Sequence, residues 1–195
     1  MPATIAAYHG TDSNNVDDIK DKNFIYKHDK SHWLGNGIYF FMDGIGEDPI
    51  TLASKWAIAQ SWNNNAKHYS YKNYSVLKTE VNLENISILD LTSDDGLELY
   101  NRYRNRLLNK LSYYDLRENY SGNSGFEYDF KLFEHIKNNS SVGIIISHIY
   151  IKFTKERKAL VKSRIPNCTI ISIDDNNYLD KGSIAEVKKG RVDNG

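Results

Sequence analysis

The order of strand-like runs and helical patterns constrains the fold of this 195-residue chain more than any other feature of its sequence. Runs of β-branched and aromatic residues predict strands over 4–8, 37–42, 142–153, 157–162 and 168–173, and one or two more within 74–91. Between these runs the sequence predicts helices over 14–20, 52–63, 94–114 and 126–137. No internal repeat is present, so we expect one mixed α+β domain over residues 1–180. The composition then turns to Gly, Lys and Asp, and we expect 181–195 to be a flexible tail.

The helix over 94–114 has the clearest pattern. Its apolar positions recur at the helical spacing and should face the core: Tyr100, Tyr103, Leu107, Leu111 and Tyr114. Arg102, Arg106 and Lys110 recur at every fourth position and form a basic stripe on the same helix. The stripe is read either as a solvated helix face or as a track for a phosphate backbone.

Composition limits the compartment and the partners. Lys+Arg and Asp+Glu both number 25, so no overall field favours nucleic acid or a membrane surface, although a local basic face is still compatible with this balance. A single cysteine, Cys168, excludes an internal disulfide framework and fits a reducing compartment. The first residues lack the pattern of a signal peptide, and no apolar run is long enough to cross a membrane. We therefore expect a cytoplasmic protein.

Three short motifs follow one another in the first third of the chain. Tyr8-His9-Gly10-Thr11 ends a strand, and a glycine there lets a ligand reach backbone N–H and C=O groups that can bind an amide. Gly35-Asn36-Gly37 precedes the strand Ile38-Tyr39-Phe40, whose tyrosine points to one face. A helix of small residues with one aromatic, Ala53-Ser54-Lys55-Trp56-Ala57, comes next.

This ordered series resembles the ADP-ribosyltransferases of the diphtheria-toxin and poly(ADP-ribose) polymerase type, which are recognised by a His–Tyr–Glu triad. The resemblance covers residues 8–57 and extends only loosely to the last strands. It implies an ADP-ribosyltransferase-like fold with two small, mainly antiparallel sheets around an NAD cleft and flanking helices. It also implies NAD as the substrate, and we expect no metal site.

The resemblance assigns a role to each matching residue. The backbone of Gly10 would bind the nicotinamide carboxamide, while His9 and Thr11 would bond the ribose on the adenosine side. Tyr39 would stack on the nicotinamide ring, and Trp56 stands where the family has a second stacking aromatic. Both could instead be core aromatics. The implied NAD-binding residues are His9, Gly10, Thr11, Gly37, Tyr39 and Trp56.

The catalytic acid is the part of the triad that the sequence leaves open. Breaking the nicotinamide–ribose bond develops positive charge on the sugar, so a nearby carboxylate stabilises the transition state. The family places a glutamate at the start of a late strand, where this chain has Lys158. Glu156 lies two residues before Lys158, so in an extended strand the two side chains would share one face. We expect Glu156 to be the acid. Glu127, in a predicted loop over 125–129, and an enzyme without an acid are the alternatives.

The resemblance therefore implies a mono-ADP-ribosyltransferase, and we expect His9, Tyr39 and Glu156 to be its catalytic residues. It would release nicotinamide and transfer ADP-ribose to a macromolecule, and we favour a nucleic-acid base over a protein side chain. The basic stripe with Arg117 and the tyrosine at 113 would guide the acceptor. Analogy suggests a toxin of a toxin–antitoxin or phage-defence system with an antitoxin partner. An NAD glycohydrolase and a non-catalytic NAD or ADP-ribose binding module are the alternatives.

Overall fold

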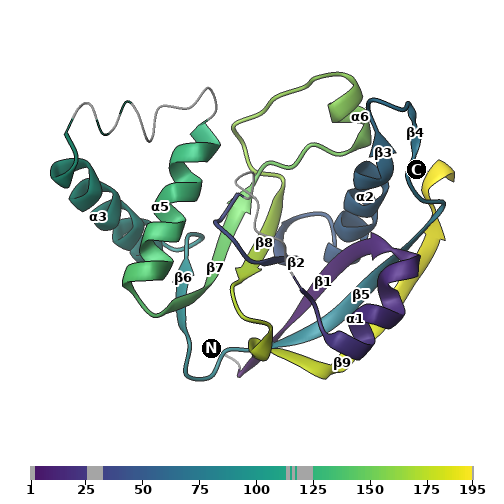
Figure 1. Ribbon diagram of the computed structural model, residues 1–195, viewed down its shortest axis with the longest axis horizontal. Coiled ribbons are helices and arrows are strands. Elements are labelled where there is room, and N and C mark those ends of the chain that lie inside the picture. The colour runs from purple at the N-terminus through teal and green to yellow at the C-terminus, as the bar shows by residue number, and fades with distance from the viewer. Residues whose placement is uncertain (1–2, 26–32, 113–114, 116, 118–124, 195) are drawn as a thin grey trace.

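The computed structural model describes residues 3–25, 33–112, 115, 117 and 125–194 (Figure 1). The first half of the chain contains β1 (Thr4–Asp12), α1 (Val16–Lys22), β2 (Ile38–Gly46), α2 (Pro49–Ser61), β3 (Trp62–Asn63), β4 (His68–Tyr69), β5 (Asn73–Asn82) and β6 (Ser87–Asp90). The second half contains α3 (Asp94–Lys110), α5 (Gly125–Asn139), β7 (Val142–Ile149), α6 (Thr154–Lys158), β8 (Cys168–Ile173) and β9 (Leu179–Arg191). Among the described residues, no helix is both long and apolar enough to cross a membrane.

One mixed sheet holds most of the strands. Its seven strands lie in the order β6-β7-β8-β2-β1-β5-β9, and β3 and β4 form a separate two-stranded sheet. β6 and β7 pair in parallel, whereas the other neighbours in the large sheet are antiparallel. The α+β class is therefore confirmed. The expected pair of small sheets is instead a single seven-stranded sheet with a minor two-stranded one.

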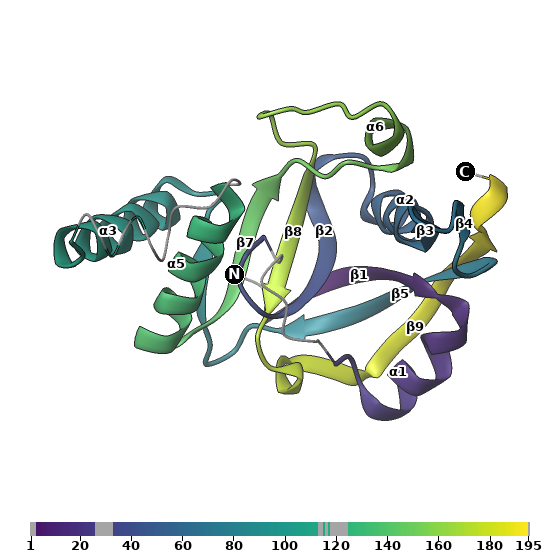
Figure 2. The same cartoon turned by 45° about the horizontal axis from the view of Figure 1, so that its top comes forward.

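The large sheet is held together only weakly at its centre. β1 pairs with β5 along its whole length, from Thr4 to Asp12. By contrast, one register position, Tyr8 opposite Phe41, joins β1 to β2. Figure 2 shows β1, β5 and β9 turning away from β7, β8 and β2. The sheet therefore consists of two halves that separate beyond Tyr8.

Apolar side chains cover both faces of the sheet. In β7, Ile145 belongs to one buried cluster, and its neighbours Ile144 and Ile146 belong to the other. The first cluster packs beneath α2 and α5, and the second packs against α1 through Val16. This double burial explains why β7 reads as a continuous apolar run, with no polar alternation. The strand alternation also decides which face each site residue occupies.

Helix α2 lies directly on β1. Its start is set by Asp48, whose side chain accepts the Thr51 N–H at 2.9 Å, and by Pro49 in the first turn. The helix thus begins a little earlier than its apolar pattern predicts. A Cβ added to Gly10 would lie 1.9 Å from the Ala53 carbonyl oxygen. The glycine after His9 is therefore required because α2 and β1 pack backbone to backbone.

The predicted core face of α3 is confirmed where the structure describes it. Leu107 is buried, and Tyr100, Tyr103 and Leu111 pack against the cluster under α2 and α5. The remaining predicted member, Tyr114, lies outside the described residues. The Tyr100 hydroxyl also donates to Asp129 at 2.9 Å, which joins α3 to α5.

The strand predicted over 157–162 is wrong. Residues up to Lys158 form the short helix α6, and the aliphatic residues that follow are exposed. The helix begins where the Glu156 carboxylate accepts the Phe153 N–H at 2.9 Å. The apolar run therefore has no sheet or core to face, because it lies in a surface connection between α6 and β8.

The flexible tail predicted for 181–195 is also wrong over most of its length. Leu179–Arg191 forms the edge strand β9, which pairs with β5. Leu179 and Ile184 are buried, although most other side chains of β9 are exposed. Backbone hydrogen bonds between strands do not depend on apolar side chains. A polar composition was therefore a poor guide to disorder here.

Candidate functional site

The site begins where the ladder between β1 and β2 stops. Continuing the pairing of Tyr8 with Phe41 would bring Gly10 opposite Tyr39, but within the described chain no further register position joins the two strands. Instead, the Nδ1 atom of His9 lies 2.9 Å from the Tyr39 carbonyl oxygen. A carbonyl only accepts hydrogen bonds, so Nδ1 carries the proton and Nε2 of the neutral ring is an acceptor. The edge of β1 from His9 to Thr11 is therefore free of a β2 partner strand.

The surroundings of His9 keep its ring neutral. Phe24 and Phe40 contact the imidazole edge-on, with centroid distances of 5.3 Å and 5.7 Å. Burial lowers the pKa of His9, and this effect outweighs the opposing hydrogen bond to Tyr39. His9 as a whole residue is nevertheless only partly buried. His9 thus offers a neutral imidazole on the face of the sheet that α1 covers.

Tyr39 lies on the opposite face of the sheet, and its hydroxyl is firmly bonded. The hydroxyl donates to the Gly35 carbonyl at 2.6 Å and accepts the Leu34 N–H at 2.6 Å. Burial raises the pKa of Tyr39, although the bond from the Leu34 N–H opposes this shift. The phenol therefore stays protonated, and the ring has a fixed position. The hydroxyl has a structural role that a stacking residue does not require.

Helix α5 holds the glycine turn in front of Tyr39. The Glu134 carboxylate accepts the Asn36 N–H at 2.7 Å and the Asn36 side-chain amide at 2.8 Å. The Lys137 ammonium donates to the Asn36 carbonyl. Gly35 has a φ of +76°, and a Cβ there would lie 2.6 Å from Glu134 Oε1. The turn therefore needs a glycine at position 35 for its backbone angle and for contact with α5.

Two predicted binding residues have local packing roles. A Cβ on Gly37 would lie 2.4 Å from the Ser172 hydroxyl, so this glycine allows β2 and β8 to approach closely. Thr11 is buried, and its hydroxyl accepts a bond from the Asn15 side chain at 3.1 Å. This bond ties the end of β1 to the start of α1.

Tyr39 and Trp56 are joined by a third aromatic residue that the sequence analysis missed. The Trp33 ring lies 6.2 Å from Tyr39 and 5.3 Å from Trp56, measured between ring centroids. We call Tyr39, Trp33 and Trp56 the aromatic row. The Arg157 guanidinium lies 5.0 Å from the Trp56 ring and continues the row. The only sequence signal for Trp33 is its place just before the glycine turn.

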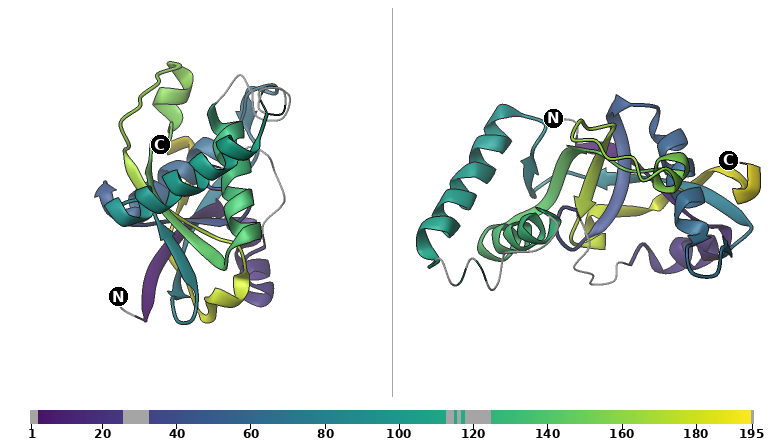
Figure 3. Two further views of the ribbon diagram at one scale, coloured as in Figure 1. Left: turned by 90° about the vertical axis from the view of Figure 1, so that its left-hand side faces the viewer. Right: turned by 90° about the horizontal axis from the view of Figure 1, so that it is seen from above.

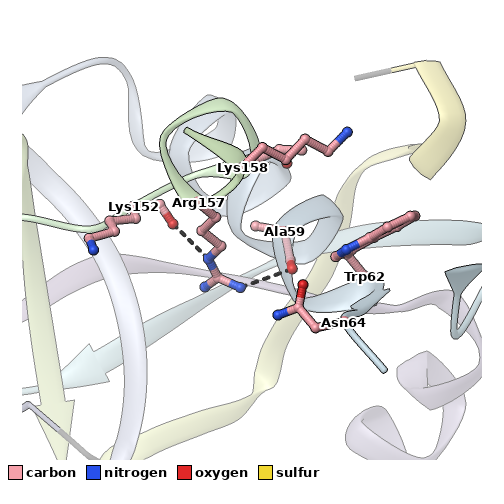
Figure 4. Close-up of a pocket in the computed structure, with 7 residues that line it drawn as sticks. Ala59, Trp62, Asn64, Lys152, Arg157 and Lys158 are labelled. Atoms are coloured by element: carbon pink, nitrogen blue, oxygen red, sulfur yellow. Dashed lines mark hydrogen bonds between the residues drawn. The ribbon is translucent and has the colours of Figure 1, made fainter. Parts of the chain in front are cut away.

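A pocket of about 250 Å³ lies at the Arg157 end of the aromatic row (Figure 4). It is lined by Ala59, Trp62, Asn64, Lys152, Thr154, Arg157 and Lys158. Arg157 points from α6 toward the end of α2, and it donates to the Lys152 carbonyl at 2.8 Å and the Ala59 carbonyl at 2.9 Å. Sequence reasoning missed this pocket because it placed Arg157 on a strand.

The structure places the two candidate acids, and Lys158, away from His9 and Tyr39 or outside the described side chains. The Glu156 carboxylate accepts the Tyr150 hydroxyl at 2.9 Å in addition to the Phe153 N–H, so it is part of the start of α6. It lies beside Arg157 in sequence and makes no described contact with His9 or Tyr39. Glu127 belongs to α5 and not to a loop, and its side chain lies outside the described part of the chain. Lys158 is exposed, with its ammonium 5.5 Å from the Trp62 ring.

Another carboxylate lies on the same side of the sheet as His9. In the strand register Leu77 stands opposite both His9 and Glu186, so the three side chains share one face. The buried Ser75 hydroxyl donates to the Glu186 carboxylate at 2.5 Å. Sequence reasoning missed Glu186 because it assigned this segment to a tail.

The basic stripe of α3 is remote from these residues. Arg102 pairs with Glu98 on its own helix at 3.0 Å, and Arg106 and Lys110 are exposed. α3 lies at one end of the molecule, whereas α2 and α6 lie at the other (Figures 1 and 3). Residue 113, the proposed stacking tyrosine, lies outside the described residues. The structure therefore does not bring the predicted track to the site.

Over the described residues, no group of three or more His, Cys, Asp or Glu side chains is placed to hold a metal ion.

Comparisons with known proteins identify a similar segment but no family. No protein-family model matches the chain. Over 86 residues the chain is 35% identical to the uncharacterized protein MJ0359 of Methanocaldococcus jannaschii. This match covers 44% of the chain and 36% of that relative's length, so the similarity is limited to one segment of each protein.

Proposed function

We propose that this protein is a mono-ADP-ribosyltransferase that cleaves NAD, releases nicotinamide and transfers ADP-ribose to a macromolecule. The observation that carries the proposal is the end of strand pairing on the β2 side of β1: among the described residues no strand pairs there with His9–Thr11, beside a neutral histidine and the aromatic row. A free strand edge offers N–H and C=O groups to an amide ligand. The neighbouring rings suit a flat heterocycle such as nicotinamide.

In this proposal NAD lies across the unpaired edge. The carboxamide binds the backbone of Gly10, and the nicotinamide ring contacts Tyr39 and Trp56. In the structure, the Trp33 ring contacts both the Tyr39 ring and the Trp56 ring. Trp33 therefore either forms one wall of the site or moves when NAD enters. The adenosine ribose donates a hydroxyl hydrogen bond to Nε2 of His9 on the other face. The Thr11 hydroxyl accepts a bond from Asn15 and keeps its own hydrogen to donate to the same ribose.

The proposed fold family follows from the same feature. An ADP-ribosyltransferase-like fold has two sheets around NAD, and in this proposal the β1-β5-β9 and β6-β7-β8-β2 parts of the seven-stranded sheet would correspond to them. Their separation beyond Tyr8 supports this correspondence.

The chemistry requires stabilisation of a ribosyl cation. The bond between the nicotinamide nitrogen and ribose C1′ breaks, and its electron pair remains on nicotinamide. A lone pair of the acceptor then forms the new bond to C1′, and the acceptor loses its proton. Glu156 was the expected acid, but its two hydrogen bonds serve α6. Glu186, whose carboxylate lies on the His9 side of the sheet, is a further candidate for the acid.

The test of this proposal is a nicotinamide-release assay with NAD labelled in the adenosine half, in the presence of a cell lysate. We expect released nicotinamide together with a labelled macromolecule. His9→Ala should lower turnover by about tenfold to a thousandfold, the range for one preorganised polar contact. A folded His9→Ala protein with activity within twofold of the wild type would contradict the site.

The same assay separates the alternatives. Free ADP-ribose without a labelled macromolecule identifies an NAD glycohydrolase, and NAD binding without nicotinamide release identifies a binding module. Glu156→Gln and Glu186→Gln, compared side by side, assign the acid. The substitution that removes the catalytic carboxylate should lower turnover about a hundredfold. A toxin of a toxin–antitoxin or phage-defence system, neutralised by an antitoxin, is the biological setting that we propose. Expression in cells with and without NAD supplementation tests it.

A further inference from the structure

The pocket beside Trp62 has the charge of an anion-binding site. Lys152, Arg157 and Lys158 all contribute to its lining, and no carboxylate does (Figure 4). Lys152 and Lys158 point away from each other on either side of Arg157. None of the ion pairs between described residues involves these three cations. Their charge is therefore available to a ligand.

Arg157 is the fixed centre of this charge. Its Nε and Nη1 donate to two main-chain carbonyls, which hold the guanidinium plane in one orientation above Trp56. A guanidinium has five N–H donors, so the remaining ones can bind the oxygens of a phosphate. An arginine held in this way loses little conformational freedom when it binds an anion.

Trp62 provides an aromatic surface at the same pocket. Trp62 is a partly exposed residue, and its ring is supported edge-on by Tyr69 at a centroid distance of 5.2 Å. The Lys158 ammonium lies 5.5 Å from the ring, and the Asn64 amide lines the pocket nearby. Alternation of cations with an aromatic ring is the pattern by which proteins bind single-stranded nucleic acid, with phosphates on the cations and a base on the ring.

The position of the pocket argues against the phosphates of NAD as its ligand. Gly10 contacts α2 at Ala53, and the pocket begins at Ala59, on the order of 9 Å further along the helix. His9, the proposed contact of the adenosine ribose, lies on the other face of the sheet from Trp56. The NAD phosphates would therefore extend from the nicotinamide toward His9 and away from the pocket.

We propose that this pocket binds single-stranded nucleic acid, with a backbone phosphate on Arg157 and Lys152 and a base stacked on Trp62. The proposal rests on the proposed function, because it makes the nucleic acid the acceptor of ADP-ribose. It also relocates the acceptor site from the stripe on α3 to the α2–α6 end of the molecule, which the aromatic row connects to Tyr39.

The test is binding of a fluorescein-labelled, single-stranded 12-nucleotide RNA and its DNA counterpart, measured by fluorescence anisotropy without NAD. Lys152→Ala/Lys158→Ala should weaken binding at least tenfold and reduce the salt dependence, by about 0.7 in the log–log slope for each lost phosphate contact. Trp62→Ala should also cost about tenfold. Arg102→Ala/Arg106→Ala removes two exposed cations from α3 and is the matched control, which should bind like the wild type.

Three other outcomes of the binding experiment overturn the inference. Equal losses from the pocket and α3 variants indicate non-specific attraction, and a loss confined to the α3 variant restores the stripe as the track. Displacement of the strand by ADP-ribose, with weaker ADP-ribose binding in the pocket variants, assigns the pocket to NAD phosphates. Because no NAD is present, the result is independent of catalysis. Strand binding without nicotinamide release refutes the proposed function alone, and nicotinamide release without strand binding refutes this inference alone.

Discussion

At the residue scale, the His9 side chain joins β1 to β2 where the backbone pairing between the two strands has ended. Its Nδ1–H bonds the Tyr39 carbonyl. The same bond leaves Nε2 as an acceptor, which only the neutral ring possesses. Both the stability of this region and the proposed ribose contact therefore depend on the protonation state of His9.

This dependence predicts a loss of stability in mild acid. Burial lowers the pKa of His9 below its ordinary value of 6.5, so the unfolded chain binds more protons than the folded chain once the pH falls below about 6.5. The wild-type melting temperature should therefore fall between pH 7.5 and pH 5.5 by more than that of His9→Asn, which does not titrate. His68→Asn, at an exposed histidine, is the control and should follow the wild type. Parallel curves for wild type and His9→Asn would contradict the assignment.

The Tyr39 hydroxyl gives a second prediction at this scale. Tyr39→Phe removes the partner of both the Leu34 N–H and the Gly35 carbonyl. We expect a loss of about 1–3 kcal/mol in the free energy of unfolding, the cost of leaving a buried polar group unpaired, measured by urea denaturation. Tyr8→Phe is the matched control on the neighbouring strand. Equal stability of the two variants would mean that the turn does not depend on Tyr39.

At the element scale, α5 and the glycine turn form one unit although they are distant in sequence. Glu134→Ala removes the acceptor of two Asn36 hydrogen bonds. It should cost about 1.5–3 kcal/mol of unfolding free energy, because bonds to charged groups are the stronger ones. Glu98→Ala, which breaks an exposed pair with Arg102, should change stability by less than about 1 kcal/mol. If Glu134→Ala is equally mild, α5 does not hold the turn.

The contact of α2 with β1 predicts a severe effect at Gly10. In Gly10→Ala the new Cβ would meet the Ala53 carbonyl oxygen, a backbone atom that cannot rotate away. We expect a loss of about 2 kcal/mol or more in denaturation experiments, because helix and strand must move apart. Gly182→Ala is the control, since its nearest neighbour is a side-chain oxygen of Asp180 at 3.2 Å. A mild Gly10→Ala would show that α2 adjusts readily.

At the scale of the whole molecule, β9 closes one edge of the sheet. A chain ending after Asp180 loses nearly all of β9, exposes the edge of β5 and uncovers the core at Ile184. We expect this truncation to be aggregation-prone or unfolded at 25 °C. A chain lacking only residues 194–195 is the control. Light scattering and circular dichroism report the difference, and a stable, monomeric truncation would mean that β9 is dispensable.

The sequence by itself determined the elements whose signals are local. β2, β5, β7 and β8 follow from runs of β-branched and aromatic residues, and α2, α3 and α5 follow from apolar periodicity. These signals act within a few residues, so the composition of the segment decides the outcome. The resemblance to a known family placed His9 and Tyr39 in one site. In the structure the His9 ring bonds the Tyr39 carbonyl, while the two side chains lie on opposite faces of the sheet.

Only the tertiary structure decided the features that depend on distant partners. The helix at Glu156 formed where a strand was expected, because the apolar residues after it found no sheet to cover. The polar segment after Asp180 became a strand because β5 offered it an edge. Trp33 reached Trp56, and Arg157 reached the end of α2, through contacts that no local pattern encodes. Backbone pairing and side-chain contacts between distant segments depend on which edges and surfaces the folded sheet leaves open, and that is settled only when the whole chain packs.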